Sequence, residues 1–106
     1  MEMNAKSADR NLLLELSGEI DHHGAKNAMR ELELAVDAAL PKKLVLDLSG
    51  VTFMDSSGIG IIVGRYRKVS CVNGKVFAIN ADKRIRRILS APNLINIITI
   101  LERHEN

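Results

Sequence analysis

The chain has 106 residues, of which 46% are hydrophobic and 26% charged, a size that holds one domain whose core can fold without metal or disulfide staples. This composition argues against a disordered tail or a coiled coil, and the net charge of +2 gives no sign of a polyanionic partner. Aromatic residues make up only 3%, so the core must be aliphatic, and a nucleic-acid reader that stacks bases would lack platforms.

The first part of the chain predicts two strands and a helix. Residues 1–10 are polar and weakly patterned, which is compatible with an edge strand, and the apolar run at residues 12–16 predicts a strand. Asp21 can cap a helix over residues 24–40, whose apolar positions follow the i, i+3, i+4 rule. Pro41 ends this helix because it has no backbone N–H to donate.

The middle of the chain predicts a strand, a helix and another strand. Residues 44–48 form the clearest buried strand. The run 55–58, Asp-Ser-Ser-Gly, has the capping chemistry that opens a helix, and this helix extends to about Val69. The turn signal Asn-Gly at 73–74 then leads into a strand over residues 75–79.

The last part of the chain predicts a short helix over residues 83–91 and a final strand over residues 97–101. The resulting order is strand, strand, helix, strand, helix, strand, helix, strand. Such an alternation predicts a single α/β domain over residues 1–106, with a mostly parallel β-sheet and helices packed on it.

The helix that follows residue 55 has an unusual exposed side. One side collects the apolar residues that should face the core, namely Ile59, Ile62, Val63, Tyr66 and Val69. The opposite side collects small and apolar residues where a helix normally shows charged ones, namely Ser57, Gly60, Ile61 and Gly64. Either another element of the same domain crosses closely here, or the side is kept smooth for another protein; we favour the second interpretation. Each glycine inside a helix costs about 0.5–1 kcal/mol relative to alanine.

Ser57 lies at the rim of this smooth side, close to a predicted helix N-terminus. Unpaired backbone N–H groups and the helix dipole favour negative charge there, so the domain would tolerate a phosphate on Ser57. The phosphate would place about −1.5 to −2 charge beside Asp55, and a partner would have to desolvate it. A serine near a helix start is otherwise a plain N-cap, a role that Ser56 or Asp55 can fill instead.

Three segments together resemble the STAS-domain anti-sigma factor antagonists. They are the run 53–60 (Phe-Met-Asp-Ser-Ser-Gly-Ile-Gly), the strand 44–48 before it, and the run 18–23 (Gly-Glu-Ile-Asp-His-His). The Asp-His-His run and Val-Gly-Arg-Tyr at 63–66 look most similar to the sporulation subgroup, which acts in the sigma-F pathway. The resemblance covers the chain from about residue 12 to residue 101.

The resemblance implies a regulator that binds an anti-sigma factor and thereby releases a sigma factor. In that family the anti-sigma factor is also a serine kinase, which uses its own ATP and Mg²⁺ to phosphorylate the second serine of Asp-Ser-Ser-Gly. That serine is Ser57 here, and a PP2C-type phosphatase restores the active form. The resemblance implies no catalytic residue, cofactor or metal in the chain itself.

The resemblance also assigns the surface that contacts the partner. The implied partner-binding residues are Asp21, Asp55, Ser56, Ser57, Gly58, Gly60, Ile61 and Gly64. Family members carry a last amphipathic helix after the final strand. The residues after 101 are too few for it, so we expect that C-terminal helix to be missing or truncated.

Other functions are weaker interpretations of the same residues. A general stress-response sigma factor pathway is the alternative within the family, and a small nucleotide-binding protein is the alternative outside it, because the glycines at 58, 60 and 64 faintly resemble a dinucleotide-binding loop. A serine hydrolase would need Gly-x-Ser-x-Gly, which is absent, so we expect no enzyme. The basic run 83–87 is more typical of a solvated helix face than of a nucleic-acid contact.

Metal binding and location are predicted from single residues. A metal site would need Asp21, His22, His23 and His104 together, but adjacent histidines point apart on a strand or a helix. Cys71 is the single cysteine and cannot form an internal disulfide, which favours a reducing cytoplasm. We see no signal peptide and no run of about 18 apolar residues, so we expect a cytoplasmic domain without membrane contact.

Overall fold

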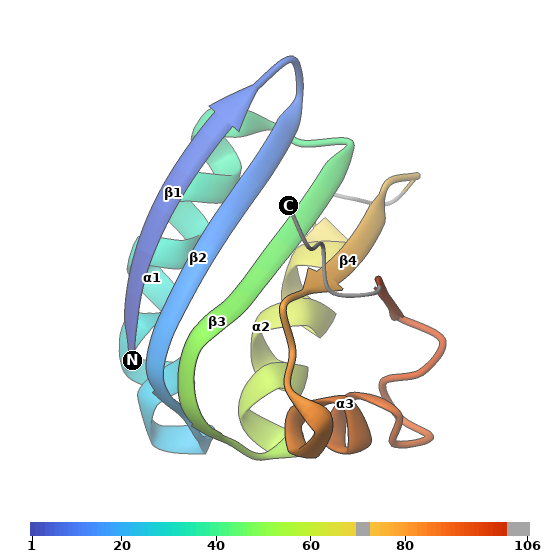
Figure 1. Cartoon of the computed structure of the whole chain (residues 1–106). Coiled ribbons are helices and arrows are strands. Elements are labelled where there is room, and N and C mark those ends of the chain that lie inside the picture. The colour runs from blue at the N-terminus through green and yellow to red at the C-terminus, as the bar shows by residue number, and fades with distance from the viewer. Residues whose placement is uncertain (70–72, 102–106) are drawn as a thin grey trace.

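A computed structural model gives the structure of the chain and describes residues 1–69 and 73–101 (Figure 1). Cys71 and His104, on which the predictions of redox state and metal binding partly depend, lie outside these residues. The predicted C-terminal truncation concerns residues 102–106, which also lie outside them.

Within the described residues, five strands form one sheet in the order β1-β2-β3-β4-β5, and three helices alternate with them. The strands are β1 (Glu2–Ala8), β2 (Asn11–Ile20), β3 (Lys43–Met54), β4 (Lys75–Ile79) and β5 (Ile98–Ile100). The helices are α1 (His22–Ala39), α2 (Ser56–Val69) and α3 (Lys83–Leu89). The pair β1–β2 is antiparallel and all other neighbouring pairs are parallel, which confirms the predicted mostly parallel α/β sheet.

Helices α1 and α2 cover one face of this sheet, where their buried residues join the same core cluster as those of the strands. Figure 1 shows α1 and α2 behind the sheet. Alternate strand residues such as Leu14, Leu46 and Ala78 are fully buried against the helices, whereas Val45 and Phe77 on the other face are half-buried.

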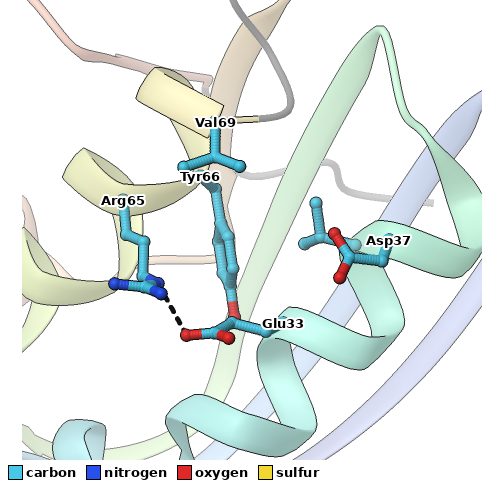
Figure 2. A pocket seen from close by; sticks show the side chains of 6 residues that line it. Glu33, Asp37, Arg65, Tyr66 and Val69 are labelled. Carbon is cyan, nitrogen blue, oxygen red and sulfur yellow. Dashed lines mark ion pairs between the residues drawn. The ribbon is translucent and has the colours of Figure 1, made fainter.

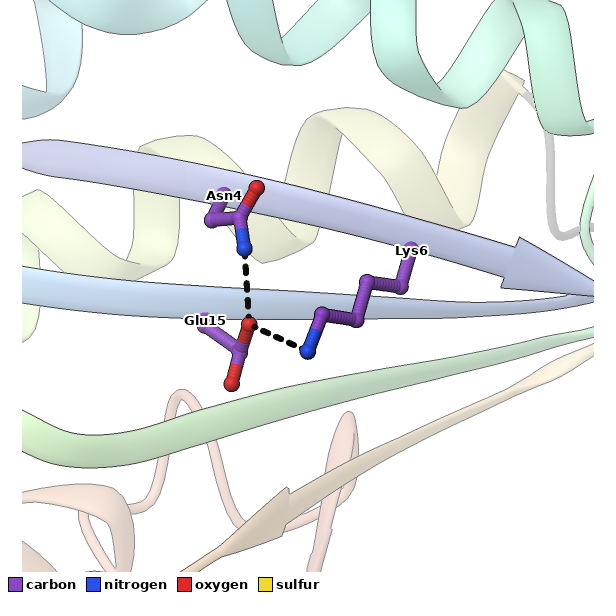
Figure 3. A network of polar contacts seen from close by, with 3 residues as sticks. All are labelled: Asn4, Lys6 and Glu15. Atoms are coloured by element: carbon purple, nitrogen blue, oxygen red, sulfur yellow. Dashed lines mark hydrogen bonds and ion pairs between the residues drawn. The ribbon is translucent and has the colours of Figure 1, made fainter.

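The edge strand β1 is attached to β2 by its backbone ladder and by a polar cluster on the open face (Figure 3). The Asn4 Nδ2 donates to Glu15 Oε1 at 2.9 Å, and the Lys6 ammonium lies 3.4 Å from the same oxygen. Exposed contacts of this kind are worth about 0–1 kcal/mol each, so they secure the edge rather than build a site.

The strands β2 and β3 run further than the sequence predicts. Strand β2 continues through Ser17 and Gly18 to Ile20, and β3 continues to Met54. The pairing of these polar ends includes two register shifts, one between Glu15 and Ser17 and one between Gly18 and Glu19. Such local irregularities cannot be seen in the alternation of residue types along the sequence. Both strands therefore end together at one edge of the sheet.

Helix α1 begins two residues before the predicted start and ends as predicted before Pro41. Its C-cap, Leu40, adopts a left-handed conformation with a φ of 44°, and the Leu40 N–H donates to the Val36 carbonyl at 2.8 Å.

No helix in the described ranges is long and apolar enough to cross a membrane.

Candidate functional site

The parallel strands β2 and β3 place two acidic helix caps side by side. Ile20 pairs with Met54, and the Asp55 N–H donates to the Ile20 carbonyl at 3.1 Å. Asp21 and Asp55 follow these strands directly, and each opens a helix. The Asp21 Oδ1 accepts the Gly24 N–H at 2.6 Å, which confirms the predicted cap of α1.

Asp55 caps α2 and also holds the hydroxyl of Ser57. Its Oδ1 accepts the Gly58 N–H at 2.7 Å and the Ser57 Oγ–H at 2.9 Å. Of the two predicted candidates for this cap, Asp55 fills the position and Ser56 does not. Ser57 therefore has no capping role, and it is exposed. Ser56 is half-buried in the first turn of the helix.

Gly58 has a packing role, and this corrects the expectation that it adds exposed contact surface. The residue is buried. A Cβ placed on it would lie 2.5 Å from the Ile20 carbonyl oxygen and 2.7 Å from the Asp21 carbonyl oxygen, closer than real Cβ atoms approach. Gly58 is not one of the two glycines on the smooth side, and its lack of a side chain lets the start of α2 approach the end of β2 closely.

The other two helix glycines are not required by packing. A Cβ on Gly60 would meet only Leu94 Cδ2, at 3.9 Å, which is an ordinary contact. A Cβ on Gly64 would meet nothing within 4 Å. Both positions are half-exposed, as is Ile61 between them. We define the docking face as the smooth side of α2 formed by Ser57, Gly60, Ile61 and Gly64.

The opposite side of α2 faces the core, with one correction. Ile59, Ile62, Val63 and Tyr66 are buried as predicted. Val69 is 67% exposed at the last position of the helix.

An ion pair lies between α1 and α2 beside the docking face (Figure 2). The Arg65 Nε lies 2.6 Å from Glu33 Oε1, over a hollow of about 70 Å³ that Tyr66 and Asp37 also line. Burial of Tyr66, with the charge of Glu33 adding to it, raises the pKa of its hydroxyl far above the ordinary value. The hollow has room for a few water molecules but not for a substrate.

A second shifted group lies on the open face of the sheet. Burial alone would raise the pKa of Asp47, but hydrogen bonds from the Asn80 amide at 3.1 Å and the Ser49 N–H at 3.0 Å outweigh it and lower the pKa. These partners tie the end of β4 to β3. The group is therefore explained by structure and does not mark a reactive site.

The predicted site residues form one continuous region. Asp21, Asp55, Ser56 and Ser57 meet at the carboxyl ends of β2 and β3, and the rest of the docking face continues along α2. The part that the sequence missed is the segment after α3, where Leu94 and Ile97 flank α2. No pattern along the chain links residues 94–97 to α2, because only tertiary packing brings them together. The described residues contain no group of three metal-ligating side chains.

Comparison with known proteins places these features in a family. The sequence family described as "STAS domain" matches residues 2–106. The anti-sigma F factor antagonist of Paenibacillus polymyxa is 32% identical over 95 residues, which span 90% of this chain and 81% of that protein. The anti-sigma-B factor antagonist of Bacillus subtilis (strain 168) is 29% identical, over 99% of this chain and 94% of that protein.

The fold is also found in a solved structure. The anti-sigma factor antagonist SpoIIAA in its unphosphorylated form aligns with a TM-score of 0.69 at 21% identity, covering 97% of this chain and 90% of that chain. The SpoIIAA of Bacillus in its phosphorylated form aligns with a TM-score of 0.66 at 23% identity, covering 94% and 91%. At these identities the alignments establish the shared fold.

Proposed function

The chain belongs to the STAS-domain family and is an anti-sigma factor antagonist of that family. We propose that its docking face binds an anti-sigma factor that is also a serine kinase. The family is regulatory rather than catalytic, so the chemistry of the switch belongs to the partners. Binding would release a sigma factor, and phosphorylation of Ser57 by the kinase, with its own ATP and Mg²⁺, would end it.

The observation that carries the proposal is the pair of glycines on the exposed side of α2. Gly60 and Gly64 each cost the helix about 0.5–1 kcal/mol, and no contact within the described residues requires them. A sequence that keeps them gains a surface without side chains, over which the backbone of another protein can approach closely. Ile61 supplies an apolar contact in the middle of that surface.

The geometry at the start of α2 supports Ser57 as the phosphorylated residue. Its hydroxyl is exposed and is oriented by the Asp55 carboxylate at 2.9 Å. A phosphate there would break this hydrogen bond and stand beside the carboxylate, yet the Asp55 cap on Gly58 would remain. The charge would therefore act on the partner, which has to desolvate it, and not on the fold. A PP2C-type phosphatase would then restore the binding form.

Two pathways remain as candidates for the sigma factor. The relatives from Paenibacillus polymyxa and Lysinibacillus sphaericus are named for the sigma-F pathway, which favours sporulation control. The relatives from Bacillus subtilis and Listeria monocytogenes are named for sigma-B, so a general stress pathway is the second candidate. Mixing the chain with each purified anti-sigma factor distinguishes them, because only the cognate one should form a complex.

The change Ser57→Asp is expected to weaken binding to the anti-sigma factor roughly tenfold or more, since it places a permanent charge on the rim of the docking face. Isothermal titration calorimetry measures this, and circular dichroism should show an unchanged fold. Ser57→Asn is the matched control, because it has the same shape without the charge. Equal affinities of the Ser57→Asp and Ser57→Asn variants would refute the charge mechanism.

The change Gly64→Lys is expected to leave the thermal melt within a few degrees of wild type and to abolish measurable binding. The new side chain points into open space, so the fold has no reason to fail, but it fills the smooth surface that a partner has to cover. Ala38→Lys is the control, since it makes the same exchange of a small residue on an exposed position of α1. Unchanged affinity of Gly64→Lys would mean that α2 is not the interface.

A further inference from the structure

The three cations in the second half of α2 have different surroundings. Arg65 is engaged, with its Nε 2.6 Å from Glu33 Oε1 on α1. Arg67 and Lys68 are exposed, and neither takes part in an ion pair with any other residue that the structure describes. The structure therefore separates one cation that fastens α2 to α1 from two that face outward.

The two outward cations border a groove at the far end of the docking face. The groove measures about 320 Å³ and is lined by Gly64, Arg67, Lys68 and Ile97. Gly64 contributes bare backbone, and Ile97, which comes from the segment after α3, contributes a half-buried apolar wall. Ile95 in the same segment is 55% exposed. The groove is thus apolar inside and positively charged along one border.

We propose that this groove is a second docking subsite for the same partner, an inference that rests on the proposed function. It would take an acidic-apolar segment of the anti-sigma factor, with an apolar side chain against Ile97 and Gly64 and carboxylates beside Arg67 and Lys68. Charge complementarity selects an acidic segment, because a basic one would meet two cations that have no neutralising partner in the described part of the chain. Continuity supports the same partner, since Gly64 belongs to both the docking face and the groove.

The distance from Ser57 gives this subsite a role of its own. Lys68 lies eleven residues after Ser57 on α2, which corresponds to about 16 Å along the helix axis. Exposed charges are largely screened beyond about 8 Å at physiological ionic strength. A phosphate on Ser57 therefore weakens contacts at the start of α2 and leaves those in the groove unchanged. The interface would consist of a switched part and an unswitched part.

The test is titration of the anti-sigma factor from the organism that encodes this chain, purified with bound nucleotide, against wild type and variants. Lys68→Glu and Arg67→Glu should each weaken binding about tenfold and make the affinity less sensitive to salt. Lys68→Arg, which keeps the charge, should bind as wild type. Lys6→Glu on the exposed edge strand β1 is the control, since it changes net charge equally at the opposite edge of the sheet from β5.

Whether the groove contacts are independent of the charge at Ser57 is tested by combining variants. The double variant Ser57→Asp/Lys68→Glu should lose the product of the two separate fold-changes, because the sites act independently. A much smaller combined loss would show that the phosphate position and the groove act as one site, and would overturn the division of the interface.

The remaining outcomes separate this inference from the function on which it rests. If Ser57→Asp weakens binding while Lys68→Glu and Arg67→Glu bind as wild type, the groove is not a subsite and the proposed function stands. If Lys6→Glu weakens binding as much as Lys68→Glu, only net charge is sensed and the groove inference fails. If the wild-type chain does not bind the anti-sigma factor at all, the proposed function itself fails.

Discussion

Incubation with the cognate anti-sigma kinase and radiolabelled ATP is expected to label the wild-type chain and the Ser56→Ala variant, and to leave the Ser57→Ala variant without label. Ser57 is exposed, and its hydroxyl donates a hydrogen bond to Asp55 Oδ1 at 2.9 Å. This hydrogen bond orients the Ser57 oxygen at the rim of the docking face. Ser56 is half-buried in the first turn of α2 and is oriented by no such contact within the described residues. An incorporated phosphate is therefore expected on one residue only.

Both alanine variants should fold normally, so the loss of label has a specific cause. The cap of α2 depends on the Asp55 Oδ1 and the Gly58 N–H, neither of which is changed. Circular dichroism and complex formation with the kinase verify this, since Ser57→Ala removes the phosphate acceptor but not the smooth surface. Label that persists on Ser57→Ala would assign the modification to another residue and would remove the proposed switch.

The largest expected effect on stability comes from Gly58→Ala, which should lower the free energy of unfolding by about 2–4 kcal/mol. Its Cβ would lie 2.5 Å from the Ile20 carbonyl oxygen, and that carbonyl accepts the Asp55 N–H. The clash is with backbone, so relief requires moving the end of β2 or the start of α2. Thermal melts and urea titrations measure the change.

Gly64→Ala is the matched substitution, and it is expected to raise the free energy of unfolding instead of lowering it. Its Cβ meets nothing, so the only expected effect on folding is the gain of about 0.5–1 kcal/mol from helix propensity. That gain corresponds to a melting temperature higher by roughly 2–8 °C in a domain of this size. Equal melting temperatures of the Gly58→Ala and Gly64→Ala variants would show that the two glycines do not have the separate roles assigned here.

The fold was predictable because its signals are local. Strand β4 has the predicted bounds, and Asp21 caps α1 as its residue type suggests. The ends of β2 and β3 were not predictable, because register shifts, and not alternating side chains, keep them paired.

The candidate site was predictable only in part. The helical periodicity of α2 separated the core side from the docking face. The sequence alone, however, does not show which of the three glycines in this helix is needed for packing. Only the approach of Ile20 and Asp21 distinguishes Gly58 from Gly60 and Gly64. In the same way, neither the pairing of Arg65 with Glu33 nor the position of Ile97 beside α2 can be inferred from spacing, because each depends on how separate elements pack.

The division of labour at the start of α2 has a consequence for how the cell can use the molecule. Asp55 and Gly58 hold this part of the fold together through contacts that do not involve Ser57, so a chain phosphorylated on Ser57, as proposed, would keep its fold and its resistance to proteases. Modified molecules would then accumulate as an intact reserve instead of being degraded. A phosphatase could return that reserve to service within its own reaction time, without the delay of making new protein.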